Sequence, residues 1–394
     1  MISIFYLTRL KFMSDKAHVY NTVKTCEASV NIPGVEISLV STDNVLKNVN
    51  TKESFFKKHN IKKRFDTVSL NDCSNCFKSN RSRIINWIKT LSVNLSLGYF
   101  LLKERKKIDI IYFRDPFIFL PIILGKYIFK KPIFFEIHAV LSSKHGQFLN
   151  KILARISTGL IVISYGLKDY YKKFNRNIMV SFCAASEPER FIIKKSKNEL
   201  RKKLGLPEKK IILGYTGNLW KTGNNDSYGI EDIIEAMPLL DKNILFVGVG
   251  KKRDETKELE KLAEKLGVLD RVFFLPWVSK SKIIEYILSF DILLIPAAGG
   301  QIGNSPTKIF EYLCSERPIV AANTQAISEI LFDNKNALLV DYKKPKSWMQ
   351  AINTIITDKS LEVKLIKNAQ KDIKNYTWGK RGEDIIIFIK KFMI

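Results

Sequence analysis

Cysteine is scarce in this sequence, with five residues among 394. The number is odd and the positions are scattered, so the chain lacks the disulfide framework of a small secreted domain and fits a reducing compartment. Cys73 and Cys76 form the only closely spaced pair, and His59 is the only further ligand candidate nearby. Because a structural zinc ion needs four ligands, we predict no metal site.

Long apolar runs are also missing. No stretch reaches the roughly 18 uninterrupted apolar residues that a membrane-spanning helix needs. The nearest candidate, residues 116–129, is interrupted by Pro121, Gly125 and Lys126. The first residues form a short apolar segment without the charged, apolar and small-residue regions of a signal peptide. We therefore expect neither a spanning helix nor a secretory signal.

Acidic side chains are too few to balance the basic ones. There are 39 Asp and Glu against 65 Lys and Arg, which gives a net charge of +26. Residues 1–200 carry 34 basic and 15 acidic side chains, whereas residues 201–394 carry 31 and 24. The N-terminal half should therefore meet an acidic partner, which could be nucleic acid, anionic lipid head groups or a phosphorylated acceptor.

A dense part of this charge lies in residues 57–65 and 78–89, where Lys and Arg alternate with apolar and aromatic residues. Such alternation is typical of surfaces that sit on anionic membranes. An unstructured basic loop or a solvated face explains the same pattern equally well.

Apolar runs of strand length alternate with helical patterns in both halves, and 394 residues are too many for a single core. This alternation predicts two doubly wound α/β domains, each with a parallel sheet. Strands are expected at residues 2–7, 35–41, 108–113, 132–137 and 160–164, and then at 211–215, 244–247, 271–276 and 292–295.

The segment 292–323 joins a strand, a glycine loop, a helix start and a second strand. Ser305 and Pro306 suit the cap and the first turn of a helix, whose N–H groups and positive dipole end suit a phosphate. Lys308 adds a charge, and Glu311 on the same face can accept the hydroxyls of a sugar diol. An ordinary capped helix with a solvated Lys–Glu pair fits the same residues.

Within this segment, SPTKIFEYLCSERPIV resembles the donor-sugar motif of retaining GT-B glycosyltransferases, especially glycosyltransferase family 4. Glu311 matches the second glutamate of that motif, which binds the ribose of the nucleotide sugar in the family. Gly303 stands where the family carries its first glutamate, and Tyr228 stands where a lysine is usual. The resemblance covers most of the chain and is strongest over residues 205–342.

The resemblance implies a GT-B fold, in which two doubly wound Rossmann-like domains face each other across a cleft. It divides the chain into an acceptor-binding domain (1–190), a linker (191–204), a nucleotide-sugar-binding domain (205–375) and a C-terminal helix (376–394) that packs back on the first domain.

The resemblance also assigns roles to individual residues. His138, at the end of the pattern Glu136-Ile137-His138, takes the family's catalytic position facing the transferred sugar. The residues implied to bind the donor are Gly217, Asn218, Lys221, Ser305, Pro306, Thr307, Lys308 and Glu311, with further contacts from Lys16, His18, Trp277, Val278 and Gly300.

The function implied is transfer of a sugar, with retention, from a nucleoside-diphosphate sugar to a lipid-linked or cell-surface glycan such as lipopolysaccharide. The chain has no D-x-D triplet, which a metal-dependent enzyme would use. The helix start at Ser305, together with Lys308, can stabilise the departing diphosphate in place of a cation. We therefore expect no cofactor and no obligatory metal. The basic N-terminal half further predicts a peripheral protein on the cytoplasmic face of the membrane.

Two other functions fit parts of the sequence. A nucleotide-sugar epimerase of GT-B architecture would use similar phosphate contacts, but it needs an acid–base pair where only His138 is at hand. A basic nucleic-acid-binding protein would explain the charge. No recognition motif for nucleic acid is present, so we expect no such partner.

Overall fold

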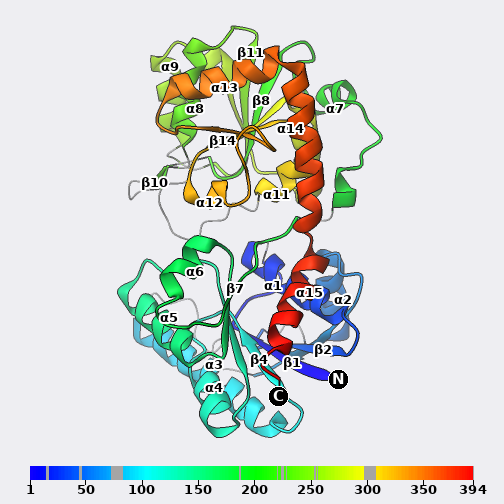
Figure 1. The fold of residues 1–394 in the computed structure, drawn as a ribbon, viewed down its shortest axis with the longest axis vertical. Coiled ribbons are helices and arrows are strands. Elements are labelled where there is room, and N and C mark those ends of the chain that lie inside the picture. The colour runs from blue at the N-terminus through cyan, green and yellow to red at the C-terminus, as the bar shows by residue number, and fades with distance from the viewer. Residues whose placement is uncertain are drawn as a thin grey trace. The chain divides into compact units, whose positions relative to one another are not determined.

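In the computed structural model, the chain forms two compact units (Figure 1). Unit 1 contains Met1–Cys183 and Trp378–Ile394, and unit 2 contains Ala184–Thr377. The residues that the structure describes are 1–14, 17–43, 47–71, 83–185, 188–219, 221–222, 226–227, 229–252, 254, 256–296 and 308–393.

Unit 1 is built on a parallel seven-stranded sheet in the order β3-β2-β1-β4-β5-β6-β7. The order reverses between β1 and β4, and open α/β sheets bind ligands at the carboxyl ends of the strands beside such a switch point. The strands are β1 (Ile2–Thr8), β2 (Val35–Ser41), β3 (Asp66–Ser69), β4 (Ile110–Phe113), β5 (Ile133–Ile137), β6 (Gly159–Val162) and β7 (Ile178–Val180).

The helices of unit 1 cover this sheet, and several begin at a serine cap. The hydroxyls of Ser143 and Ser164 accept hydrogen bonds from the first turns of α5 and α6. The described helices are α1 (Ala17–Val30), α2 (Val49–Lys58), α3 (Arg83–Glu104), α4 (Leu120–Ile123), the π-helical turn η3 (Leu124–Ile128), α5 (Lys144–Ile156), α6 (Tyr165–Tyr171) and α15 (Trp378–Lys390).

Unit 2 repeats the same topology with a parallel six-stranded sheet in the order β12-β11-β8-β13-β14-β15, whose switch point lies between β8 and β13. Its strands are β8 (Ile211–Thr216), β11 (Ile244–Val249), β12 (Val272–Leu275), β13 (Ile292–Ile295), β14 (Ile319–Ala322) and β15 (Leu338–Val340), and β9 (Lys221–Thr222) pairs with β10 (Asp226–Ser227) in a small antiparallel ribbon.

The helices of unit 2 precede, connect and follow these strands along the chain. They are α7 (Lys197–Leu204), α8 (Ile230–Ala236), α9 (Thr256–Lys265), α10 (Lys280–Ser289), α11 (Lys308–Leu313), α12 (Gln325–Ser328), α13 (Pro345–Thr357) and α14 (Lys359–Asp372), with short 3₁₀ turns η4 (Pro188–Phe191), η5 (Met237–Leu239), η6 (Leu269–Arg271) and η7 (Ile373–Asn375).

The central strands of both sheets are buried on both faces. Every residue of β4, β5, β13 and β14 is buried, and nearly all are apolar. Strands that are covered by helices on both sides are continuous apolar runs in sequence, and for this reason they could be predicted. The prediction of two doubly wound α/β domains is confirmed.

The unit boundaries differ from those expected in sequence. The chain passes from unit 1 to unit 2 after Cys183, whereas the sequence predicted this boundary near residue 190. The second half of the expected linker is helix α7 of unit 2, because buried Arg201 donates to the Asp291 carboxylate and to the Ser289 carbonyl, and so fixes the helix to its unit. The final helix α15 belongs to unit 1 and lies beside α1 (Figure 1).

The basic stretch at 57–65 is not the amphipathic surface that its pattern indicated. His59 and Phe65 are buried in unit 1, so they are not available to a membrane. Lys58 donates to the carbonyl of Met13, and Arg64 pairs with Glu53 at 2.6 Å. The described residues include no helix with the length and apolar character needed to cross a bilayer.

Candidate functional site

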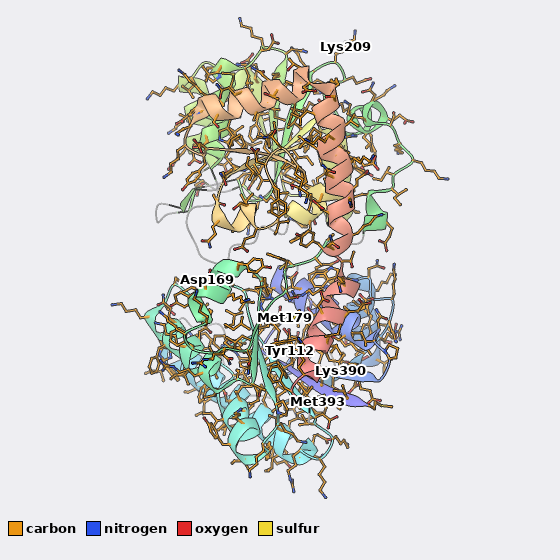
Figure 2. The ribbon with its side chains drawn as sticks, viewed as in Figure 1. Tyr112, Asp169, Met179, Lys209, Lys390 and Met393 are labelled. Carbon is orange, nitrogen blue, oxygen red and sulfur yellow. The ribbon has the colours of Figure 1, made fainter. Side chains whose placement is uncertain are left out.

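The carboxyl end of β5 in unit 1 carries a buried carboxylate, that of Glu136. His138 Nε2 contacts the Oε1 atom of Glu136, and Tyr112 donates its hydroxyl to Oε2 at 2.6 Å. Arg381 Nη2 also donates to Oε1, at 2.7 Å. Tyr112, labelled in Figure 2, comes from the neighbouring strand β4, while Arg381 comes from α15. Side chains from three segments of the chain therefore hold this carboxylate.

These contacts fix the charges at the edge of the sheet. Burial alone would raise the pKa of Glu136, but Arg381 and His138 outweigh it and hold that pKa well below its ordinary value. Burial and the charge of Arg114 lower the pKa of His138 to about 4, although Glu136 opposes this shift. At neutral pH, Glu136 is therefore ionised and His138 is neutral.

The hydrogen-bond network then decides which ring nitrogen of His138 carries the proton. A carboxylate only accepts hydrogen bonds, so Nε2 must be the donor toward Glu136. Nδ1 keeps a free lone pair, and no residue in the described part of the chain bonds to it. His138 thus offers a ligand a neutral, oriented hydrogen-bond acceptor.

Arg381 is the buried cation behind this arrangement. Its Nη1 atom donates to the Ser181 hydroxyl and to the Phe182 carbonyl, both at 2.8 Å, while Nη2 holds Glu136. Both partners of the Arg381–Glu136 ion pair are almost fully buried. The last helix of the chain therefore orients His138 through Glu136.

Arg114, whose charge lowers the pKa of His138, also bonds to the start of the first helix. It follows β4, and its Nη1 atom donates to the carbonyl of His18 at 3.4 Å, at the start of α1. His18 and His138 thus share the same edge of the sheet, beside its switch point. Lys16 lies outside the described residues.

In unit 2, Lys308 and Gly217 meet beside the switch point between β8 and β13. The Lys308 ammonium lies 3.9 Å from the ring centroid of Tyr215. Gly217 has a φ of +147°, and a Cβ atom there would lie 2.7 Å from Lys308 Nζ. Only glycine allows this approach, so the lysine sits directly against the backbone at the end of β8.

Burial tunes the charge of this lysine. It lowers the pKa of Lys308 to about 7, and Glu311 in the same helix opposes the shift. In the described part of the chain, no side chain forms a salt bridge with Lys308. A bound anion would favour the charged form and fill that place.

Polar groups around Lys308 are held by aromatic hydroxyls. Tyr312 bonds to the backbone N–H of Thr216 at 2.9 Å, which fixes α11 to the end of β8. Tyr215 donates its hydroxyl to the Asn218 carbonyl at 3.2 Å. The structure therefore brings together four of the predicted donor residues, namely Gly217, Asn218, Lys308 and Glu311.

The other predicted residues are less well placed or not described. Trp277 is exposed and Val278 is half-buried in the loop after β12. Lys221 is in β9, but its side chain is not among those described. The remaining predicted donor residues, Gly300, Ser305, Pro306 and Thr307, fall outside the described residues. So do Gly303 and Tyr228, the two positions at which the sequence departs from the family's motif.

A metal was not expected, and that expectation stays a prediction. The described residues hold no group of three or more His, Cys, Asp and Glu side chains arranged around a common point. Cys73 and Cys76, the only close cysteine pair, are outside the described part.

Comparison with known families gives this geometry a context. Residues 196–372 match the family model described as glycosyl transferases group 1. These residues are therefore similar to the group 1 glycosyl transferases. The match contains most of unit 2, including both Lys308 and Gly217.

One curated relative of this chain is a D-inositol 3-phosphate glycosyltransferase of Xylanimonas cellulosilytica. It is 23% identical over 185 residues, which cover 47% of this chain and 43% of the relative. The chain thus spans less than half of the length of that relative.

Solved structures match nearly the whole chain in fold. Anabaena HepE in complex with UDP has a TM-score of 0.76 at 15% identity, with full coverage of both chains. WaaG, a glycosyltransferase involved in lipopolysaccharide biosynthesis, has a TM-score of 0.65 at 13% identity, covering 97% of this chain and 98% of WaaG. These likenesses show that the fold is GT-B.

Sequence reasoning assigned no positioning role to the residues that hold the predicted ones in place: Tyr112, Arg114, Glu136, Tyr215 and Arg381. One signal was present for Arg381, which lies four and eight residues before Ile385 and Ile389 on the buried face of α15. A charge at that spacing marks a cation inside the core. Its partner lies 245 positions away, and no local pattern could name it.

Proposed function

We propose that the protein is a retaining glycosyltransferase that uses a nucleoside-diphosphate sugar. The observation that carries the proposal is the Lys308 ammonium packed against Gly217, within the residues that match the group 1 glycosyl transferases. A cation at the end of a strand, beside a close backbone approach, suits a diphosphate. Glu311, three residues further along α11, suits the ribose hydroxyls.

In the proposed reaction, the bond between the anomeric carbon and the diphosphate oxygen breaks. A bond forms between that carbon and an acceptor hydroxyl oxygen on the same face, and the hydroxyl proton passes to the departing diphosphate. Lys308 stabilises the charge that grows on the leaving group, so no metal ion is required. His138 accepts a hydrogen bond from a sugar hydroxyl through Nδ1 and positions the ring.

The acceptor we propose is a lipid-linked or cell-surface glycan, with the protein peripheral on the cytoplasmic face of the membrane. The positive charge of unit 1 supports this choice, because its sequence contains 34 Lys and Arg against 14 Asp and Glu. The epimerase and the nucleic-acid-binding protein gain no support from the relatives, which carry glycosyltransferase names.

The first experiment is a thermal-shift titration of the full chain with UDP, GDP and ADP. A nucleotide that binds the native state raises Tm by mass action, roughly 2.7 kcal/mol of stabilisation at a hundredfold excess over Kd. We expect one nucleotide to raise Tm in the wild type and much less in Glu311→Ala.

The matched control is Glu264→Ala, which removes an exposed helical glutamate from the same unit. It should respond like the wild type. If no nucleoside diphosphate raises Tm in the wild type, the donor site and the proposed activity are both wrong.

A further inference from the structure

Helix α3 has two apolar faces, and only one of them packs on unit 1. Val93, Leu97 and Leu101 are buried against the body of the unit. Six residues spaced three or four apart share the opposite face, with exposed fractions of 42% to 72%. This exposed stripe consists of Ile84, Ile88, Leu91, Leu95, Tyr99 and Leu102.

The stripe is long and continuous. A rise of about 1.5 Å per residue makes it roughly 27 Å long, so it runs along nearly the whole helix. Trp87 adds an exposed indole beside it and contacts the ring of His145 in α5 at a centroid distance of 5.8 Å. Isolated exposed apolar residues are normal, but a contiguous patch of this size marks an interaction surface.

The stripe ends in a basic pocket. An open pocket of about 650 Å³ is lined by three apolar and three cationic side chains and by no acidic one. The guanidinium of Arg105 donates one hydrogen bond to the Leu102 carbonyl, which holds it at the pocket and leaves further N–H groups for a ligand. The lining residues are Leu102, Ile128, Phe129, Arg105, Lys106 and Lys131.

More positive charge surrounds this pocket. Residues 103–107 and 126–131 contain seven Lys and Arg and a single acidic residue, Glu104. Glu104 is already paired with Lys107 at 2.8 Å. The apolar side chains Tyr127 and Ile128 of η3 are exposed among these cations. Apolar side chains beside a rim of cations are the composition of an interfacial membrane surface.

We propose that the α3 stripe and the basic pocket dock unit 1 on an anionic lipid bilayer. The stripe enters the boundary between head groups and acyl chains, with α3 lying in the membrane plane, and the pocket takes a lipid phosphate. This proposal names the surface behind the membrane association in the proposed function, but it does not require glycosyl transfer.

Charge selects the bilayer over a second copy of this chain. Joining two stripes would bring together two units whose sequences each carry a net charge of +20. Neither the stripe nor the pocket lining offers a carboxylate to compensate. An anionic surface attracts the same cations, and salt weakens that attraction.

The test is co-sedimentation of the full chain with vesicles of two compositions. One is phosphatidylcholine alone, and the other is equal parts of phosphatidylcholine and phosphatidylglycerol. We expect binding to the anionic vesicles that weakens as salt is added. Leu91→Ser/Leu95→Ser and Lys106→Gln/Lys131→Gln should each weaken it roughly tenfold or more.

Two controls on unit 2 match these changes in charge and polarity. Lys209→Gln/Lys242→Gln removes two exposed lysines, of which Lys209 is labelled in Figure 2. Leu269→Ser/Val363→Ser removes two exposed apolar side chains. Both controls should bind anionic vesicles like the wild type.

Three results would overturn the proposal. The first is equal binding to both vesicle types, and the second is an equal loss of binding in the unit 2 controls. The third is a protein that binds no vesicles but forms a dimer in solution, which Leu91→Ser/Leu95→Ser dissociates. The last result would assign the stripe to a second copy. The nucleotide-dependent rise in Tm is measured on the same variants, so loss of the donor site and loss of membrane docking are distinguished.

Discussion

The two units share one topology, yet they treat charge in opposite ways at the carboxyl edges of their sheets. In unit 1, Arg381 and Tyr112 hold the Glu136 carboxylate, and the group offered to a ligand is the neutral imidazole of His138. In unit 2, Lys308 offers a cation stacked on an aromatic ring. One fold therefore supplies a neutral acceptor or a charge, depending on which buried partners the rest of the chain provides.

The two units also differ in the helices that cover their sheets. Helix α9 of unit 2 buries Leu259 and Ala263 and exposes lysine and glutamate, as a solvated helix does. Helix α3 of unit 1 exposes its stripe of apolar residues instead. Unit 1 thus combines internally balanced charge at its site with an outer face that needs a partner.

The strongest way to break the comparison is to remove the buried cation of unit 1. Arg381→Met removes the arginine that is paired with buried Glu136. Breaking a buried pair on one side costs about 3–5 kcal/mol. We expect urea denaturation to show that loss in the transition of unit 1. The nucleotide response of unit 2 should survive wherever unit 1 remains folded.

The neighbouring lysine provides a control for this variant. Lys380 is exposed and pairs with Asp384 on the same helix at 2.7 Å. Lys380→Met removes a positive charge from the surface and should leave the denaturation midpoint almost unchanged, because exposed pairs contribute little. Equal losses from the two substitutions would contradict a special role for Arg381.

One strand of unit 2 and the site of unit 1 show how much of the structure could be predicted from the sequence. The strand Ile292–Ile295 was predicted with the bounds observed, because a buried parallel strand is a continuous apolar run. His138 was predicted from the resemblance of Glu136-Ile137-His138 to the family's pattern, and its catalytic role stays a prediction. Its positioning residue Arg381 was not predicted, since distant tertiary pairing leaves no local pattern.

Burial also misled the prediction of surfaces. Phe56 and Phe65 flank a run rich in lysine in the sequence, yet both lie in the core of unit 1. The apolar stripe of α3 reads as an ordinary helix, and only the structure shows that its second apolar face stays exposed. Periodicity tells which residues share a face, but it does not tell which face is covered.

Removing the cation of unit 2 should have the next largest effect. A hydrogen bond to a charged group contributes about 1.5–3 kcal/mol, so Lys308→Met should weaken binding of the preferred nucleoside diphosphate roughly tenfold to a hundredfold in calorimetry. The control is Lys335→Met, since Lys335 also lies over an aromatic ring of unit 2, that of Phe332. It should keep the wild-type affinity.

The pH dependence of binding sharpens this prediction. The pKa of Lys308 is lowered to about 7, so the free protein loses this proton as the pH rises above 7. A bound diphosphate favours the charged form, and binding must then take up a proton. The last ionisation of the phosphate has a pKa of about 6, so the charge of the ligand is constant between pH 7.5 and 9. In this range, Kd should rise by up to roughly tenfold per pH unit. Lys308→Met should show a flat profile there.

The smallest effect expected is the loss of a single hydroxyl in unit 1. Tyr112 donates to the Glu136 carboxylate at 2.6 Å. Among the described residues, the hydroxyl of Tyr6, on the adjacent strand, bonds only to the Thr22 hydroxyl, at 3.4 Å. Tyr112→Phe should therefore cost about 1.5 kcal/mol and Tyr6→Phe about 0.5 kcal/mol, because bonds to charged groups are stronger. Both rings are buried, so the substitutions are matched in packing. Equal costs would mean that Arg381 and His138 alone satisfy Glu136, and that the hydrogen bond from Tyr112 does not stabilise the charged carboxylate.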